Sequence, residues 1–462
     1  MIRAKRSLTT LVCCCVLCVA MSAHAQTKPS DAETRAASAK LKAVLRKDPG
    51  ALVEEVIALR RAQPRVAAAA LLSIKPDELT TKASLRSMQL SLELMESPEA
   101  QQVLLDAFEA SLKDKADGWE QRVVLVRGAA RLEGELAGKL LMAAAGDPHP
   151  KVRLALAQQL LEMKRPDRDA IAAAIEVLEA TEKAKDLGTP HRLARQALTK
   201  RVGFDHPDAA AWRKYWADAG AAFDPAKRGP LAELKLEHDT DPRYYDEAVI
   251  SRRVLFIVDQ SKSMDGVILE SWPGAPEGKS PRRGGGGADG FSWFLTPQQV
   301  EWLKTNPEAQ LIVRAKAELN WILQGLPADA KFNIVAFETG LTPWKKSLMP
   351  ATPNNVKDAK KFVDGLVPKG HTRADLALAE IFTGNIEADT VYFLSDGRPS
   401  ADGRKDMPTQ PILDFVWRAN RFTGTTIHTY GIEVDDEAEK FLKNLATGRY
   451  RKIVGPPQRR GK

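Results

Sequence analysis

The stretch RVLFIVDQSKSM, residues 253–264, decides the fold of the C-terminal half of the chain. It opens with a continuous apolar, largely β-branched run, which is typical of a strand buried on both faces of a parallel sheet. The run ends in one carboxylate and two hydroxyls at alternate positions, Asp259, Ser261 and Ser263. Open α/β sheets bind ligands at the carboxyl ends of their strands, and oxygen donors suit a hard cation. The triplet therefore predicts a metal site, provided that other segments complete it.

Two later segments supply further oxygen donors. Thr372 lies in the turn GHTRAD, residues 370–375, which opens an apolar-periodic helix. Asp396 directly follows a second apolar run, TVYFLS at residues 390–395. The predicted strands and helices alternate through this part of the chain, which favours an α/β fold with a doubly wound, mostly parallel sheet. Each of the two apolar runs is thus followed directly by a potential metal ligand, Asp259 in the first and Asp396 in the second.

Together the three segments resemble the von Willebrand factor type A family and its metal-ion-dependent adhesion site. The family pattern is Asp-x-Ser-x-Ser, then a Thr in a Gly-rich turn, then an Asp before Gly. The matching positions are Asp259, Ser261, Ser263, Thr372 and Asp396. The resemblance implies a Rossmann-like domain that binds Mg²⁺ or Mn²⁺ through these residues. It also implies that an Asp or Glu of a protein partner completes the metal's coordination.

Two features depart from the family pattern. Lys262 stands between the two serines, where the family often has Gly, and a cation there would favour anionic partners. A Gly-rich insertion, residues 266–306, separates the first motif from the helix that normally follows at once. An insertion of this length at a ligand-binding edge is more often functional than part of a packed core, although its order is left open. The candidate partner-contact residues are Lys262, His371, Arg373 and Trp293.

The N-terminal half is rich in Ala, Leu, Glu, Lys and Arg with helical periodicity. Short predicted helices joined by short breaks indicate an all-α solenoid. The segment DPHPKVRLALA, residues 147–157, resembles the HEAT-repeat consensus, in which an Asp-Pro turn precedes a helix that opens with Val-Arg. Residues 205–216 resemble the closing helix of such domains, and Trp212 and Trp216 are expected to share one apolar face that caps it. The number of repeats is left open.

The N-terminus has the features of a cleavable secretory signal. Basic residues precede an apolar stretch at residues 8–21, and Ala23-His24-Ala25 is a small-x-small cleavage site, so the mature chain is expected to begin near Gln26. The stretch is short for a membrane span. All four cysteines lie within this signal, so no disulfide or thiol nucleophile is expected in the mature chain. We expect a periplasmic or secreted protein without a transmembrane segment after cleavage.

These observations predict five segments. They are a signal peptide, residues 1–25; a HEAT-like helical domain, residues 26–220; a linker, residues 221–250; a von Willebrand factor type A domain, residues 251–455; and a basic tail, residues 456–462. The formal net charge is +8, and part of it lies in the tail. We interpret the tail as a solvent-exposed basic segment, without a binding role. No segment resembles a nucleic-acid module, and we expect no nucleic-acid partner.

The predicted function is that of an exported, non-enzymatic protein for binding or cell adhesion, with the helical domain as its scaffold. The sequence contains no His-Glu-x-x-His motif, Walker loop or Gly-x-Ser-x-Gly elbow, and we assign no catalytic residue. A structural envelope module with a vestigial metal site is the first alternative. A metal-dependent hydrolase is the second, less favoured one. The partner's identity and the oligomeric state are left open.

Overall fold

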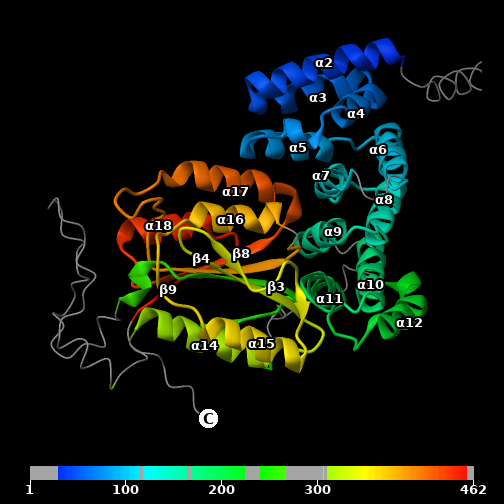
Figure 1. Cartoon of the computed structure of the whole chain (residues 1–462). Coiled ribbons are helices and arrows are strands. Elements are labelled where there is room, and N and C mark those ends of the chain that lie inside the picture. The colour runs from blue at the N-terminus through cyan, green and yellow to red at the C-terminus, as the bar shows by residue number, and fades with distance from the viewer. Residues whose placement is uncertain are drawn as a thin grey trace, which may run out of the picture. The chain divides into compact units, whose positions relative to one another are not determined.

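The computed structural model describes residues 30–113, 118–163, 168–223, 240–266, 305, 310–384 and 386–454. The predicted signal peptide, most of the predicted linker and insertion, and the basic tail lie outside these residues. The chain divides into two compact units, residues 1–177 with 201–230 and residues 178–200 with 231–462. The described part of the first is helical, and the second is built around a sheet (Figure 1). Across the described residues, no helix is both long and apolar enough to span a bilayer.

The first unit is a solenoid-like stack of short helices. Their bounds are α2 (Asp31–Lys47), α3 (Leu52–Ala62), α4 (Pro64–Leu72), α5 (Lys82–Glu93), α6 (Pro98–Ser111), α7 (Trp119–Ala129), α8 (Glu135–Ala145), α9 (Pro150–Glu162) and α12 (Ala209–Ala219). Helices α2, α4, α6 and α8 pack in one row, and α3, α5, α7 and α9 pack in a second. Helices α10 (Arg168–Lys183) and α11 (Thr189–Val202) each contribute residues to both units. The all-helical prediction is confirmed.

A buried ion pair fixes the turn between α8 and α9. The guanidinium of Arg122, on α7, donates to Asp147 through Nε at 2.7 Å, and both side chains are fully buried. The same carboxylate accepts a hydrogen bond from the backbone N–H of His149 at 2.8 Å. Pro150 then occupies the first turn of α9, where its missing N–H leaves no hydrogen bond unmade. One carboxylate thus joins α7 to the beginning of α9.

Trp212 and Trp216, which we expected to share one apolar face, pack into different surroundings. Trp212 is fully buried, with ring centroids 4.7 Å from His206 and 6.3 Å from Phe204. Trp216 is half-buried and packs edge-on against Phe223, 5.2 Å away. The two tryptophans lie one helical turn apart on α12. The partners of Trp212 precede this helix in the sequence, whereas Phe223 follows it, so the two rings pack against different segments.

The second unit contains a sheet with the strand order β5-β4-β3-β7-β8-β9. The bounds are β3 (Arg253–Asp259), β4 (Lys331–Phe337), β5 (Leu341–Pro343), β7 (Thr390–Ser395), β8 (Thr426–Ile432) and β9 (Tyr450–Ile453). Strands β3, β4, β7, β8 and β9 run parallel, whereas β5 and the short β6 (Met349–Pro350) pair antiparallel with β4. The prediction of a mostly parallel, doubly wound sheet is confirmed.

Helices cover both faces of this sheet (Figure 1). One core contains the side chains of Val254, Phe256 and Val258 together with α14 (Leu311–Gly325) and α15 (Pro353–Asp364). The other contains Leu255 and Ile257 together with α16 (Ala374–Thr383), α17 (Thr409–Thr423) and α18 (Asp436–Leu445). Successive strand residues point to opposite faces, so a continuous apolar run such as β3 fills both cores.

Before β3, a small ribbon packs onto the domain. Strands β1 (Arg243–Tyr244) and β2 (Glu247–Ala248) pair antiparallel. Tyr244 is fully buried in the same core as β3, and its ring lies 5.2 Å from that of Tyr430. This aromatic contact attaches the segment before β3 to the sheet.

The segments on either side of the insertion are in contact. Gly266 follows the short 3-10 helix η5 (Lys262–Asp265), and its carbonyl accepts a hydrogen bond from the backbone N–H of Leu311 at 3.0 Å. Leu311 begins α14, and residues 306–309 lie outside the described residues. The described residues before and after the insertion are therefore neighbours in the fold.

Candidate metal centre at the carboxyl ends of β3 and β7

Strands β3 and β7 are neighbours, so the polar residues that follow them meet at one edge of the sheet. The Ser263 hydroxyl donates a hydrogen bond to Oδ1 of Asp396 at 2.8 Å. The hydroxyl oxygens of Ser261 and Ser263 lie 3.0 Å apart. The structure thus joins side chains that are 133 residues apart in the sequence.

Asp259 lies beneath this chain of hydroxyls and is fully buried. Its Oδ1 accepts a hydrogen bond from the backbone N–H of Ser261 at 2.8 Å, and its Oδ2 accepts one from the Ser395 hydroxyl at 2.6 Å. Burial raises the pKa of Asp259 to about 6, against the opposing effect of hydrogen bonds from Ser261 and Ser395. A buried carboxylate is costly to ionise without a compensating charge, and a bound cation would supply that charge.

The turn that carries Thr372 is held against the first motif. The backbone N–H of Lys262 donates to the carbonyl of Gly370 at 3.3 Å, and that of Lys369 donates to the carbonyl of Gln260 at 2.8 Å. Thr372 is buried, and its carbonyl accepts a hydrogen bond from the backbone of Ser400. Within the described residues its hydroxyl has no hydrogen-bond partner, which leaves that oxygen available to a ligand.

The donors at this edge fit a hard cation. Asp259 and Asp396 are carboxylates, and Ser261, Ser263 and Thr372 are neutral hydroxyls. Mg²⁺ takes oxygen ligands and commonly uses one or two protein carboxylates while it keeps several waters. In the described part of the chain, no group of three or more His, Cys, Asp or Glu side chains could hold a metal ion. This edge differs from such a cluster because most of its donors are hydroxyls.

The predicted partner-contact residues lie in different settings. The Lys262 side chain is 51% exposed and forms an ion pair with Asp265. The Arg373 guanidinium makes two hydrogen bonds of 2.8 Å to Asp375, so a partner would have to compete with that carboxylate. His371 is half-exposed beside the Thr372 turn. Trp293 lies outside the described residues.

Two features of this edge were not predicted from the sequence. Ser395 hydrogen-bonds Asp259 across the two strands, although the sequence indicates only that it precedes Asp396 in the motif Ser-Asp-Gly. The loop around Gly403 also packs on the Thr372 turn. The approach is close, since an added Cβ at Gly403 would lie 2.5 Å from Nδ1 of His371. The first feature could have been inferred from the position of Ser395 at a strand end. The second depends on tertiary packing and has no local signal.

Comparison with known proteins identifies the fold of the second unit. Residues 309–450 match the family profile described as the von Willebrand factor type A domain. The C-terminal part of the chain is a von Willebrand factor type A domain. Thr372 and Asp396 lie inside the match, whereas Asp259, Ser261 and Ser263 precede the insertion and lie outside it.

The relatives share this domain rather than the whole chain. Human von Willebrand factor A domain-containing protein 3B is 29% identical over 129 residues, which is 28% of this chain and 9% of that protein. Inter-alpha-trypsin inhibitor heavy chain H2 of Mesocricetus auratus is 24% identical over 219 residues, 45% of this chain and 18% of that protein. Among solved structures, a von Willebrand factor type A protein from Catenulispora acidiphila is 19% identical with a TM-score of 0.30, covering 45% of this chain and 40% of that one. This chain thus spans less than a fifth of the length of these two curated relatives.

Proposed function

We propose that the von Willebrand factor type A domain is a non-enzymatic binding module that holds Mg²⁺ and captures an acidic group of a protein partner. The metal would be held by Asp259, Ser261, Ser263, Thr372 and Asp396. The observation that carries the proposal is the hydrogen-bonded chain from Ser261 through Ser263 to Asp396, above the buried Asp259. These donors converge from separate segments at the edge where α/β sheets bind ligands.

The charges of the donors favour an acidic partner. Two carboxylates leave a divalent cation with coordination positions for water or for another oxygen ligand. A bound Mg²⁺ would supply positive charge at this edge, which attracts a partner's Asp or Glu. Ser263 and Asp396 are half-buried, so this part of the site is reachable from solvent, whereas Asp259 is not. We assign Asp259 the role of holding charge beneath the cation and Ser395 that of orienting Asp259.

Similarity to von Willebrand factor type A domains supports a binding role. We extend the proposal to the whole chain: the helical unit is a HEAT-like scaffold or second binding surface, and the protein is exported through its predicted signal. The buried Arg122–Asp147 pair supports the first part, because it stiffens the Asp-Pro turn that resembles the HEAT consensus. Cleavage near Ala25 in secreted material, read by N-terminal sequencing, tests the second part.

A metal-dependent pull-down tests the binding role. Tagged wild-type protein is incubated with envelope extract in Mg²⁺ or in EDTA, beside the variants Asp259→Ala and Asp414→Ala. Asp414 is exposed on α17, is not one of the proposed ligands, and controls for the loss of a carboxylate. We expect a partner to be retained in Mg²⁺ by the wild type and by Asp414→Ala, and lost in EDTA or with Asp259→Ala. A partner retained equally by all proteins in both buffers would contradict the proposal.

A further inference from the structure

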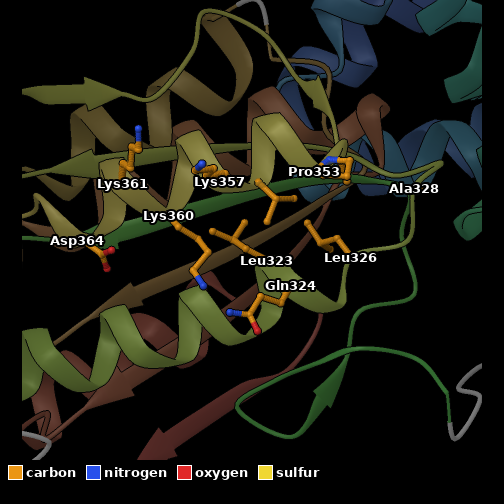
Figure 2. Close-up of a pocket in the computed structure, with 11 residues that line it drawn as sticks. Leu323, Gln324, Leu326, Ala328, Pro353, Lys357, Lys360, Lys361 and Asp364 are labelled. Atoms are coloured by element: carbon orange, nitrogen blue, oxygen red, sulfur yellow. The ribbon is translucent and has the colours of Figure 1, made fainter.

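A groove between α14 and α15 forms a second candidate site on the von Willebrand factor type A domain. Its volume is about 700 Å³, within the range of ligand-binding clefts. The apolar side chains of Leu323, Leu326 and Val356 line it. Figure 2 shows the two leucines projecting between the helices and Lys360 reaching from α15 toward Gln324 of α14. The groove thus joins an apolar floor to a charged rim.

The groove lies toward the other edge of the sheet from the candidate metal centre. Helix α14 begins beside Gly266, next to the metal motif, and ends just before β4 starts at Lys331. The groove is lined by the last turn of α14, at Leu323 and Gln324, and by the loop that follows it. A ligand in the groove therefore need not contact the metal, and the two sites can be tested separately.

Three lysines of α15 give the rim its positive charge. Lys357, Lys360 and Lys361 line the groove, and none forms an ion pair with another described residue. The carboxylates on the same helix have partners of their own, and one of them, Asp364, also lines the groove. Asp358 pairs with Lys345 at 2.9 Å, and Asp364 accepts a hydrogen bond from Asn320 at 2.7 Å. The lining thus carries three lysines and one carboxylate, and this net positive charge favours a negatively charged ligand.

We propose that this groove binds an acidic amphipathic helix of a protein partner. Lys357 and Lys361 stand four positions apart, about one turn of α15, whereas Lys360 reaches toward α14 (Figure 2). A partner helix with carboxylates beside its apolar face places them near these lysines. Its apolar face then covers Leu323, Leu326 and Val356, as in other complexes in which a helix occupies a groove.

Charge excludes one alternative occupant. The basic C-terminal residues of the chain, including Arg459, Arg460 and Lys462, carry the same sign as the rim and would be repelled. The stretch LAELKLEHD, residues 231–239, has the required composition within the chain itself, and an anionic lipid shares the required charge. We favour a helix from another protein, because it would complement both the positive rim and the apolar floor, and the experiment separates it from the other two.

Fluorescence anisotropy with the full-length protein in EDTA tests the proposal. The probe is a labelled helix-forming peptide with leucines along one face and glutamates flanking them. We expect saturable binding that weakens at least about tenfold in Lys360→Glu and in Val356→Ser. Lys440→Glu makes the same charge change at an exposed position on α18 and should bind the probe like the wild type. Circular dichroism confirms that each variant is folded.

Several outcomes would overturn the proposal. One is equal binding of the probe by Lys360→Glu and Lys440→Glu, or equal binding of a probe in which serines replace the leucines. Another is binding of phosphatidylglycerol vesicles, but not of the peptide, with dependence on Lys360. A third is binding of the peptide only after Glu233→Gln and Glu237→Gln, which would identify residues 231–239 as the occupant. Because EDTA is present throughout, failure of the metal site affects none of these results.

Discussion

The Ser395 hydroxyl donates a hydrogen bond of 2.6 Å to Oδ2 of Asp259, linking the ends of two neighbouring parallel strands. Both side chains are buried, so the bond fixes the orientation of the carboxylate beneath the Ser261 and Ser263 hydroxyls. The candidate centre is therefore held by a contact within the sheet as well as by its loops.

Replacing Ser395 with Ala should weaken metal binding without removing a donor. The substitution leaves one oxygen of buried Asp259 without its side-chain partner, and loss of such supporting contacts typically lowers metal affinity about tenfold or more. Titration calorimetry with Mn²⁺ measures the change. Thr383→Ala is a matched control, because that hydroxyl bonds only within α16, to the carbonyl of Ala379. Equal affinity in the two variants would show that Ser395 does not position Asp259.

Gly370→Ala should disturb the turn that carries Thr372. Gly370 has φ +65°, and an added Cβ would meet the Glu338 carboxylate and Thr339 Oγ1. The left-handed conformation alone costs a residue with a Cβ about 1–2 kcal/mol. We expect a lower unfolding temperature and weaker Mn²⁺ binding. Gly340→Ala is the control, since an added Cβ there meets no atom within 4 Å, and it should change neither measurement.

Asp147→Ala should destabilise the helical unit strongly. It leaves the fully buried Arg122 guanidinium without its carboxylate, and breaking one side of a buried ion pair typically costs about 3–5 kcal/mol. Chemical denaturation followed by circular dichroism measures the loss, with exposed Asp106→Ala on α6 as control. Combining Arg122→Met with Asp147→Leu should recover part of the stability, because no buried charge then remains. A loss no larger than that of the control would contradict the role given to this pair.

Stability of the von Willebrand factor type A domain should decrease in mild acid because of His428. Its ring stacks on Tyr392 with centroids 5.0 Å apart, and Nδ1 accepts a hydrogen bond from the backbone of Arg449. Burial, aided by the Arg449 charge, lowers the pKa of His428 from 6.5 to about 4. The unfolded chain therefore binds more protons between these two values, so stability present above pH 6.5 is lost as the pH falls toward 4.

The matched variant for this pH effect is His428→Gln, which lacks the titrating group. The difference in unfolding free energy between wild type and variant should change by about 3 kcal/mol or less across that pH window. Taking the difference cancels groups common to both proteins, including Asp259, whose raised pKa acts in the opposite direction. A difference that does not vary with pH would show that His428 titrates normally in the folded state.

Local sequence patterns were sufficient to predict most of the fold. Strands β3 and β7 were predictable because continuous apolar runs suit a sheet covered on both faces. Parallel pairing of these strands places Asp259 and Asp396 at one edge of the sheet, so the sequence was sufficient to predict that these two residues lie close together. Proline and hydroxyl caps similarly indicated helix starts, as at Ser97 and Pro98 in α6. Apolar runs and helix caps are set by residues a few positions apart, so the sequence alone indicates them.

Features that depend on tertiary contacts were not predictable. The segment from Leu341 to Pro350 forms the two short strands β5 and β6 instead of one continuous edge strand. The Asn333 side chain explains the interruption, because its amide bonds both the backbone N–H and the carbonyl of Lys345 in place of regular strand pairing. The packing of Gly403 on His371 and the groove between α14 and α15 arise in the same way, from residues far apart in the sequence.

The most direct test of the central claim is calorimetric titration of Mg²⁺ and Mn²⁺ into the purified protein. Wild type, Asp259→Ala and the control Asp414→Ala are compared under identical conditions. We predict saturable binding of one ion per chain to the wild type and to Asp414→Ala, and its loss in Asp259→Ala. Absence of binding to the wild type, or equal binding by all three proteins, would contradict the assignment of the metal to the edge formed by β3 and β7.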